Sequence, residues 1–214
     1  MSVVSRLREE LSQKFYSATH HQFTNELCAG TLADAKLYTY LVQDAKFFMI
    51  SLKSLARTIQ LCDSDASTVV LGRQMGFFCA DENTYFERSL QELRDSGFTA
   101  DIPALPEVEE FLAFLRTLTT SESYVRNIVA LYTFELVYLL WAEPHEKTVD
   151  HLQFKHKEWV YLHSGPGFTK WVQFLESEVL RVVNAGNLTE ARETMSRVVD
   201  LENMFFESTY NYDE

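Results

Sequence analysis

Glycine and proline are scarce in this chain of 214 residues, which contains seven glycines and four prolines. A protein built from many short strands needs both residue types at its turns, so their scarcity argues against an all-β fold. No segment alternates apolar and polar residues as a half-buried strand does, and no internal repeat is visible. Hydrophobic residues make up 46% of the chain, which is enough for one well-buried core. We therefore predict a single all-α domain.

Basic residues are too few to balance the acidic ones, and the net charge is −12 at pH 7. Such a surface repels phosphate backbones and anionic lipids, so we expect neither nucleic acid nor a membrane as a partner. The first residues carry charges where a signal peptide needs an apolar core, and the apolar run from Ile128 to Ala142 is too short and too acidic to span a bilayer. We expect a soluble protein of the cytosol or nucleus, with the cytoplasm as the favoured location.

The motifs of metal and cofactor enzymes are also missing. The three cysteines show no CxxC spacing, and no Glu-x-x-His pair of the kind that binds a di-iron centre occurs. No Gly-rich phosphate loop, serine nucleophile elbow or recognisable Cys-His pair is present. His20 or His21 could ligate a haem, but a solvated histidine at a joint between helices explains both residues better. We predict no metal and no cofactor.

A buried acidic residue is the most informative feature that is present. Glu135 lies at the centre of the apolar run, where it shares a helical stripe with Leu131 and Tyr138. Burial of an ionised carboxylate is costly, so this residue needs hydrogen-bond donors, a cation, a ligand or a raised pKa. A core glutamate satisfied by a tyrosine or an arginine would produce the same pattern.

Two further acids interrupt apolar helix faces. Asp44 sits within the stripe of a long helix, and Glu202 lies on a face with 4-3-4-3-4 spacing that runs from Ala191 to Thr209. Like charges in a low-dielectric core repel each other and raise at least one pKa. We predict that Asp44, Glu135 and Glu202 converge on one enclosed cavity lined by aromatic residues.

Apolar residues at helical spacing, with capping and breaking residues at the ends, predict the secondary structure. A capping box formed by Thr31 and Asp34 indicates a long helix that ends near Cys62, and Asn187 with Glu190 forms another box before the last helix. The other helices are expected at about residues 2–17, 22–30, 66–79, 81–96, 107–118, 124–143, 150–163 and 168–183.

Acids and aromatic rings in one cavity suit an organic ligand. Carboxylates accept hydrogen bonds from exocyclic amino groups and, when protonated, donate to ring nitrogens. Aromatic walls stack on a flat ring and exclude water. These properties favour a heteroaromatic base that carries amino groups.

Four segments resemble the TenA/thiaminase II family. Three contain the buried acids: Tyr-Leu-Val-Gln-Asp44, Ala-Leu-Tyr-Thr-Phe-Glu135-Leu-Val-Tyr138 and Glu202-Asn-Met-Phe-Phe206. The fourth, His21-Gln-Phe-Thr-Asn-Glu-Leu-Cys-Ala-Gly-Thr-Leu32, is similar to an N-terminal stretch of the family. The resemblance covers nearly the whole chain. It implies a haem-oxygenase-like helical bundle that binds no haem over residues 1–214, and a homo-oligomer, either a dimer or a tetramer.

The resemblance also implies a reaction, because the family salvages the pyrimidine half of damaged thiamin. The expected activity is hydrolysis of an aminopyrimidine, such as aminomethylpyrimidine, to hydroxymethylpyrimidine. One branch of the family has a catalytic cysteine on the buried central helix and another has glutamate there, and Glu135 puts this chain with the second. The resemblance implies that Glu135 and Glu202 are acid/base residues and that Asp44 holds the substrate's amino and ring nitrogens. The other substrate-binding residues implied are Phe47, Phe48, Phe111, Tyr138 and His163.

Some positions depart from the family. His163 stands where a tyrosine or tryptophan is common, and Phe111 stands where many members have a pocket tyrosine. An alternative function is therefore a non-catalytic pyrimidine-binding or interaction protein on the same fold. Binding alone needs one carboxylate, whereas proton transfer needs two with separated pKa values, so the pair Glu135 and Glu202 favours an enzyme. We expect desolvation to keep Glu135 partly protonated and to leave Glu202 the more ionised of the two.

Overall fold

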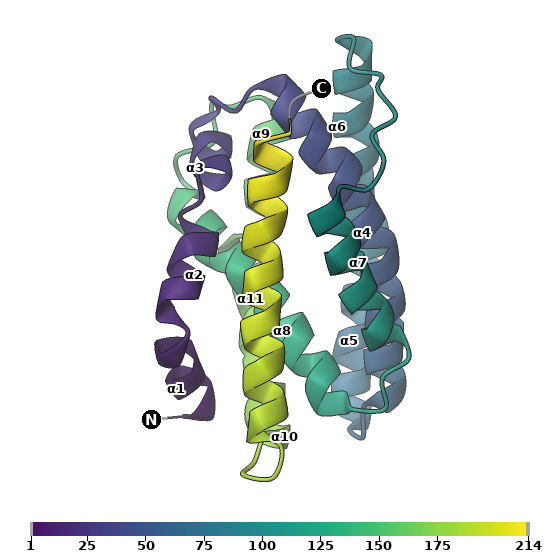
Figure 1. Ribbon diagram of the computed structural model, residues 1–214, viewed down its shortest axis with the longest axis vertical. Coiled ribbons are helices and arrows are strands. Elements are labelled where there is room, and N and C mark those ends of the chain that lie inside the picture. Colours follow the sequence, from purple (N-terminus) through teal and green to yellow (C-terminus); the bar gives the residue numbers. More distant parts are fainter. Residues whose placement is uncertain (1, 213–214) are drawn as a thin grey trace.

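The computed structural model describes residues 2–212, which form helices and connecting loops with no strand among them. The all-α prediction is therefore confirmed. Figure 1 shows an elongated bundle whose longer helices run roughly along its long axis. In chain order the elements are α1 (Val3–Glu10), α2 (Ser12–Thr19), α3 (Gln22–Ala29), α4 (Asp34–Leu61), α5 (Asp65–Phe77), the π-helix η1 (Phe78–Glu82), α6 (Asn83–Asp95), α7 (Pro106–Thr119), α8 (Tyr124–Ala142), the 3-10 helix η2 (Glu143–His145), α9 (Phe154–Leu162), α10 (Gly165–Val182) and α11 (Leu188–Tyr210).

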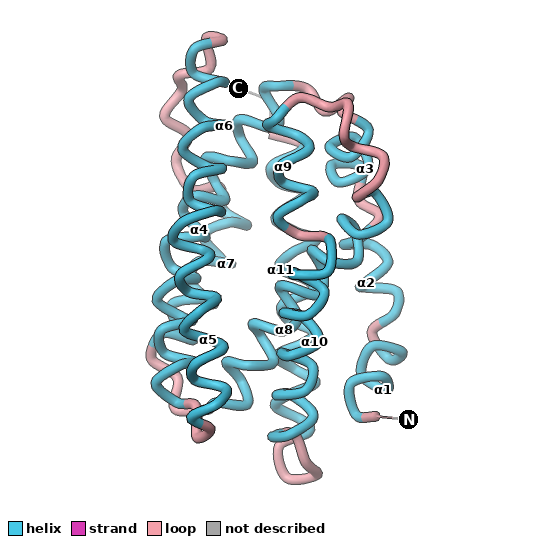
Figure 2. The backbone as a smooth tube through the Cα atoms, turned by 180° about the vertical axis from the view of Figure 1, so that it is seen from behind, coloured by secondary structure: helices cyan, strands magenta, loops and turns pink. Residues whose placement is uncertain are grey.

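The bundle is organised around α8, which carries the long apolar run of the sequence. This helix packs against α10 and α11, and it also contacts α2 and α4. Figure 1 shows α11 passing in front of α8, with α1–α3 on one side and α4–α7 on the other, and Figure 2 shows α9 and α10 from behind. Because neighbours cover α8 on several sides, most of its residues are buried, as expected for a helix that is apolar nearly all round.

The segment from α5 to α6 is continuous, so the prediction of two separate helices that break near residue 80 is wrong. A π-helix joins them, and Phe78, Glu82, Phe86 and Leu90 follow one another at four-residue intervals. Four residues of α-helix turn through about 400°, so a row at this spacing drifts off one face of a straight α-helix. The wider turn of a π-helix rotates less per residue and offsets part of this drift.

Several predicted helix ends also differ. The first predicted helix is divided at Leu11, whose backbone leaves the α-helical region, giving α1 and α2. The capping box at Thr31 is wrong, because α4 begins at Asp34 without a side-chain cap and the Asp34 carboxylate pairs with Lys155 at 2.6 Å. Asn187 is the N-cap residue of α11, but its side chain accepts from the Asn184 N–H and leaves the helix uncapped. The local sequence predicts the approximate helix ends, but the expected capping side chains bond to other groups in the folded protein.

The helical segment Tyr124–His145 is long and apolar enough to cross a bilayer by length and composition alone. The expectation that the apolar run is too short is therefore wrong, because the helix begins before Ile128 and extends beyond Ala142. The protein itself covers most of this segment, since 72% of its most apolar window is buried. A core helix of a folded domain has this character.

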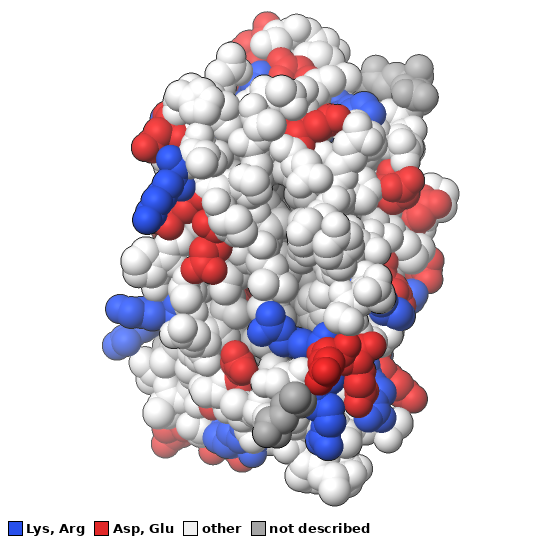
Figure 3. All heavy atoms as spheres, turned by 90° about the vertical axis from the view of Figure 1, so that its left-hand side faces the viewer, with Lys and Arg blue, Asp and Glu red and all other residues white. Residues whose placement is uncertain are grey.

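Charge is unevenly spread on the face that carries α1–α3. Figure 3 shows a broad, mostly uncharged area in the upper middle of this face, with acidic and basic side chains along the edges and in a cluster below it. On α2 the aromatic side chain of Tyr16 is 61% exposed and stacks on His20 with ring centroids 4.1 Å apart. A single exposed aromatic ring is ordinary on a folded surface, so Tyr16 alone does not define a contact region.

Candidate active site

A cavity lies among α4, η1, α8 and α9. The centres of water molecules can occupy about 50 Å3 of it. One water needs roughly 10–15 Å3 by this measure, so the cavity has room for more than one. Aromatic rings form much of its wall, and its ionisable carboxyl groups come from three separate elements. The lining residues are Asp44, Phe47, Phe48, Ser51, Leu55, Phe78, Glu82, Leu131, Phe134, Glu135, Tyr138, Trp159 and His163.

Asp44 enters the cavity from the middle of α4 and is 4% exposed. Its Oδ2 atom is buried and has no hydrogen-bond partner in the protein. Burial raises the pKa of the Asp44 carboxyl from 3.8 to about 7, and the neighbouring Tyr40 hydroxyl acts in the opposite direction. Buried polar atoms are nearly always paired, so the unpaired oxygen of Asp44 indicates a group that is kept for a ligand.

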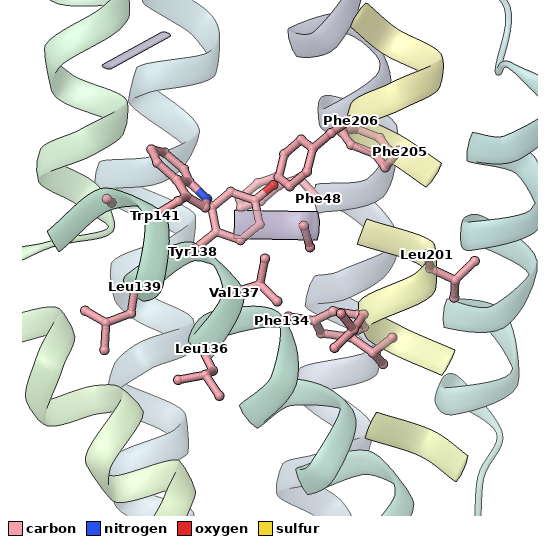
Figure 4. Packing of buried hydrophobic residues seen from close by; sticks show 14 of the residues in the cluster. Phe48, Phe134, Leu136, Val137, Tyr138, Leu139, Trp141, Leu201, Phe205 and Phe206 are labelled. Atoms are coloured by element: carbon pink, nitrogen blue, oxygen red, sulfur yellow. The ribbon is translucent and has the colours of Figure 1, made fainter. Parts of the chain in front are cut away.

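Glu135 lines the same cavity from α8, and part of its surface remains open to that space. Burial raises its pKa from 4.5 to about 8, which agrees with the prediction that desolvation keeps it partly protonated. The Trp171 indole lies near enough to lower this pKa, although its N–H makes no hydrogen bond to a protein group. Figure 4 shows two sides of α8: the side chains of Phe134 and Val137 lie on the side toward α11, and those of Leu136 and Leu139 lie on the opposite side.

Glu202 is 1% exposed on α11, but it is not among the residues that line the cavity. Burial and then the charges of Asp44 and Glu135 raise its pKa well above the ordinary value, so the three acids are electrostatically coupled. Burial raises the pKa of both Glu135 and Glu202, and the expectation that Glu202 is the more ionised of the two stays a prediction. Its Oε1 atom is buried without a partner.

Some of the aromatic residues predicted for the site line the cavity and others do not. Phe47 and Phe48 line the cavity, whereas Phe111 does not. The ring of Phe111 packs against Phe47 and Phe134 with centroid distances of 4.8 and 5.6 Å. Phe111 therefore supports the wall from behind.

A hydrogen-bonded group holds one wall of the cavity in place. The hydroxyls of Tyr40 and Tyr138 lie 2.8 Å apart, and the Trp159 indole N–H donates to Tyr40 at 3.2 Å. The Nδ1 atom of His163 lies 2.8 Å from the Trp159 carbonyl oxygen, which only accepts, so Nδ1 carries the ring hydrogen. Burial lowers the pKa of His163 to about 4. This histidine is therefore neutral and supplies no positive charge to the acids.

Glu82 is the acid that sequence reasoning missed. It lines the cavity from the last position of η1. The sequence pattern put this residue in the first turn of a separate helix, where an acid is ordinary because it favours the helix N-terminus. The four-residue spacing of Phe78, Glu82 and Phe86 was the signal that could have placed it on the buried side.

The part of the chain covered by the structure, residues 2–212, contains no group of three or more His, Cys, Asp and Glu side chains placed to hold a metal ion. His20 lies on the surface groove beside Tyr16, where its ring contacts Thr19 and the Tyr16 carbonyl. The Nε2 atom of His21 pairs with Glu207 at 2.8 Å. Both histidines therefore lie at the joint between α2 and α3; His20 is exposed as predicted, whereas the His21 side chain is only 9% exposed and its Nδ1 accepts from the Phe23 N–H.

The model of the TENA/THI-4/PQQC family matches residues 8–212. The chain belongs to the TENA/THI-4/PQQC family. No curated protein matches its sequence significantly. The family prediction is confirmed, and the assignment to the branch with glutamate in place of cysteine remains a prediction.

Solved structures confirm the fold. A TenA homologue from Pyrococcus furiosus is 18% identical and superposes with a TM-score of 0.85, covering 97% of this chain and 99% of that one. A proposed TenA-like thiaminase from Sulfolobus solfataricus is 13% identical, with a TM-score of 0.75 and coverage of 96% and 95%. A domain from Shewanella denitrificans with a haem-oxygenase-like fold is 14% identical, with a TM-score of 0.72 and coverage of 97% and 91%. The chain is therefore a haem-oxygenase-like helical bundle.

Proposed function

We propose that this TENA/THI-4/PQQC family member hydrolyses a small thiamin-derived aminopyrimidine to hydroxymethylpyrimidine and ammonia or an amine. The observation that carries the proposal is the presence of Asp44 and Glu135 in one buried cavity with aromatic walls. Acids with raised pKa values inside an apolar cleft are typical of active sites. Family membership and the structural likeness to a proposed thiaminase support a hydrolase in thiamin metabolism.

Asp44 is suited to bind the substrate's nitrogen-rich edge. A 4-aminopyrimidine presents an amino group that donates and an adjacent ring nitrogen that accepts, and a carboxyl group can complement both. Because the pKa of Asp44 is about 7, its protonated form is available near neutrality to donate to the ring nitrogen. Phe48, Tyr138 and Trp159 supply flat apolar surface for the ring. Asp44 therefore orients the substrate.

The reaction exchanges one bond for another at the exocyclic methylene carbon. Water forms a new C–O bond, and the C–N bond to the amine breaks with its electron pair going to nitrogen. One carboxylate removes a proton from the water, and one carboxylic acid gives a proton to the leaving amine. Glu135 is placed to perform one of these transfers because it faces the cavity with its pKa near 8.

A second candidate function is non-catalytic pyrimidine binding. It is favoured by the position of Glu202, which is buried on α11 and is not among the residues that line the cavity. The two functions are separated by incubating the purified protein with aminomethylpyrimidine, its formyl derivative and thiamin, and measuring hydroxymethylpyrimidine by chromatography. We expect turnover of at least one of the three. Saturable binding without any product would favour the binding protein and overturn hydrolysis.

A further inference from the structure

We propose that Glu82, at the end of the π-helix between α5 and α6, is the catalytic acid that protonates the leaving amine. This inference rests on the proposed hydrolysis and names the residue responsible for one of its two proton transfers. It replaces Glu202 in the acid/base pair.

The cavity lining carries the first part of the argument. Hydrolysis requires a proton donor and a proton acceptor that both reach the ligand. Glu202 does not line the cavity, whereas Glu82 and Glu135 line it from two different elements, η1 and α8. With Asp44 assigned to binding, Glu82 and Glu135 are the two remaining carboxyl groups that line this space among residues 2–212.

The π-helix explains why Glu82 faces inward. Phe78 and Glu82 both line the cavity, whereas Asp81 beside them is exposed. The residues that follow are held firmly, because Tyr85 stacks on Trp159 with ring centroids 4.7 Å apart and Trp159 itself forms part of the cavity wall. Short π-helical turns occur often at functional sites, where they direct a side chain that a regular helix would turn away.

The surroundings favour the protonated form of the Glu82 carboxyl. Burial raises its pKa first, then the charges of Glu135 and Asp44 raise it further, and no group acts in the opposite direction. The groups that line the cavity with Glu82 are Asp44 from α4, Glu135 from α8 and His163, which follows α9 and is neutral. A carboxyl group without a facing cation holds its proton near neutral pH, which is the state that a donor requires.

The proposed step conserves atoms and charge. The Glu82 proton passes to the amine nitrogen as the C–N bond breaks. The water oxygen bonds to the methylene carbon, and the ionised form of Glu135 accepts the released proton. Glu82 then bears the charge and Glu135 the proton. Exchange of one proton between the two carboxyls, through water in the shared cavity, restores the starting state.

The test compares Glu82→Gln with Asp81→Asn, a matched control that removes the exposed acid next to it. With aminomethylpyrimidine we expect kcat of Glu82→Gln to fall about 100-fold, with little change in KM, and the Asp81→Asn variant to behave like the parent. Glu82→Asp keeps an acid and should retain more activity than Glu82→Gln. Circular dichroism and product binding establish that each variant is folded and has an intact cavity.

A second substrate distinguishes a proton donor from an acceptor. The trimethylammoniomethyl analogue loses neutral trimethylamine, which needs no proton, so Glu82→Gln should lose less than about fivefold in kcat on it, while Glu135→Gln should be impaired on both substrates. Equal losses for Glu82→Gln on both substrates would overturn the donor role. An active parent with an unimpaired Glu82→Gln variant would overturn this inference alone, whereas a parent that hydrolyses no aminopyrimidine would overturn the proposed function as well.

Discussion

Replacement of Glu135 by glutamine separates a catalytic role from a structural one. Glutamine keeps the size and shape of the side chain but cannot exchange the proton, so kcat for aminomethylpyrimidine should fall about 100-fold. KM should change little, because Asp44 and the aromatic walls remain in the cavity. The neighbouring Glu122→Gln change, on an exposed residue just before α8, is a matched control that should leave both parameters unaltered.

The same variant should alter how stability depends on pH. Burial raises the pKa of Glu135 from 4.5 to about 8, so between these values the unfolded chain releases a proton that the folded protein retains. The folded parent therefore loses stability as pH rises through this window, with a slope of about 1.4 kcal/mol per pH unit for one such group. Because glutamine lacks the titration, the variant should gain up to about 3 kcal/mol relative to the parent between pH 5.5 and pH 7.5. This is an upper limit, since one side of the carboxyl faces the cavity and remains close to water.

Calorimetry at the two pH values measures this effect together with steady-state kinetics. A change of about 3 kcal/mol corresponds to a shift of roughly 6–12 °C in Tm for a protein of this size. A variant that is stabilised at pH 7.5 and turns over substrate within about threefold of the parent would show that Glu135 is a structural core acid. A difference in Tm that is the same at both pH values would refute the argument that the carboxyl is held protonated.

Three further predictions follow from the site and the surface. Asp44→Asn should raise KM about tenfold or more with a smaller effect on kcat, because it changes how the nitrogen edge is held; an unchanged KM would remove Asp44 from the binding role. Elemental analysis of protein purified without added metal should find no stoichiometric iron, manganese or zinc, and a full equivalent of any of them would contradict the organic site. Light scattering should give a mass above the 24.8 kDa of the monomer, and Tyr16→Asp should lower it if the α1–α3 face forms the contact; a monomeric parent at micromolar concentration would reject self-association.

Helical periodicity was sufficient to find the main elements and the buried acids. Asp44 and Glu202 each interrupt an otherwise apolar stripe, and the structure leaves both less than a twentieth exposed. Such a pattern indicates that a helix face is buried, but not whether that face packs against a neighbouring helix or faces a cavity. Glu202 and Phe111 are not among the lining residues, although their stripes look like those of Asp44 and Phe47.

Glu82 was hidden by a different cause. Its place in the cavity depends on a π-helical turn, and the periodicity expected of a regular α-helix does not include the smaller rotation per residue of that turn. The sequence around it, Cys79-Ala-Asp-Glu82, also resembles the polar start of a new helix. The cavity itself depends on side chains from helices far apart in the chain, so no local pattern could give its size or its full lining.

Trp159, which donates a hydrogen bond to Tyr40, is an intrinsic fluorescent probe of this cavity. The chain has three tryptophans, all of which are buried, and Trp159 is the one whose ring forms part of the cavity wall. A ring that settles against Trp159 changes the surroundings of that indole while Trp141 and Trp171 stay outside the contact. Intrinsic fluorescence should therefore follow the filling of the cavity without a label, and a Trp159→Phe variant should remove the response while the emission of the other two tryptophans remains. Ligands that bind but are never transformed become measurable in the same way.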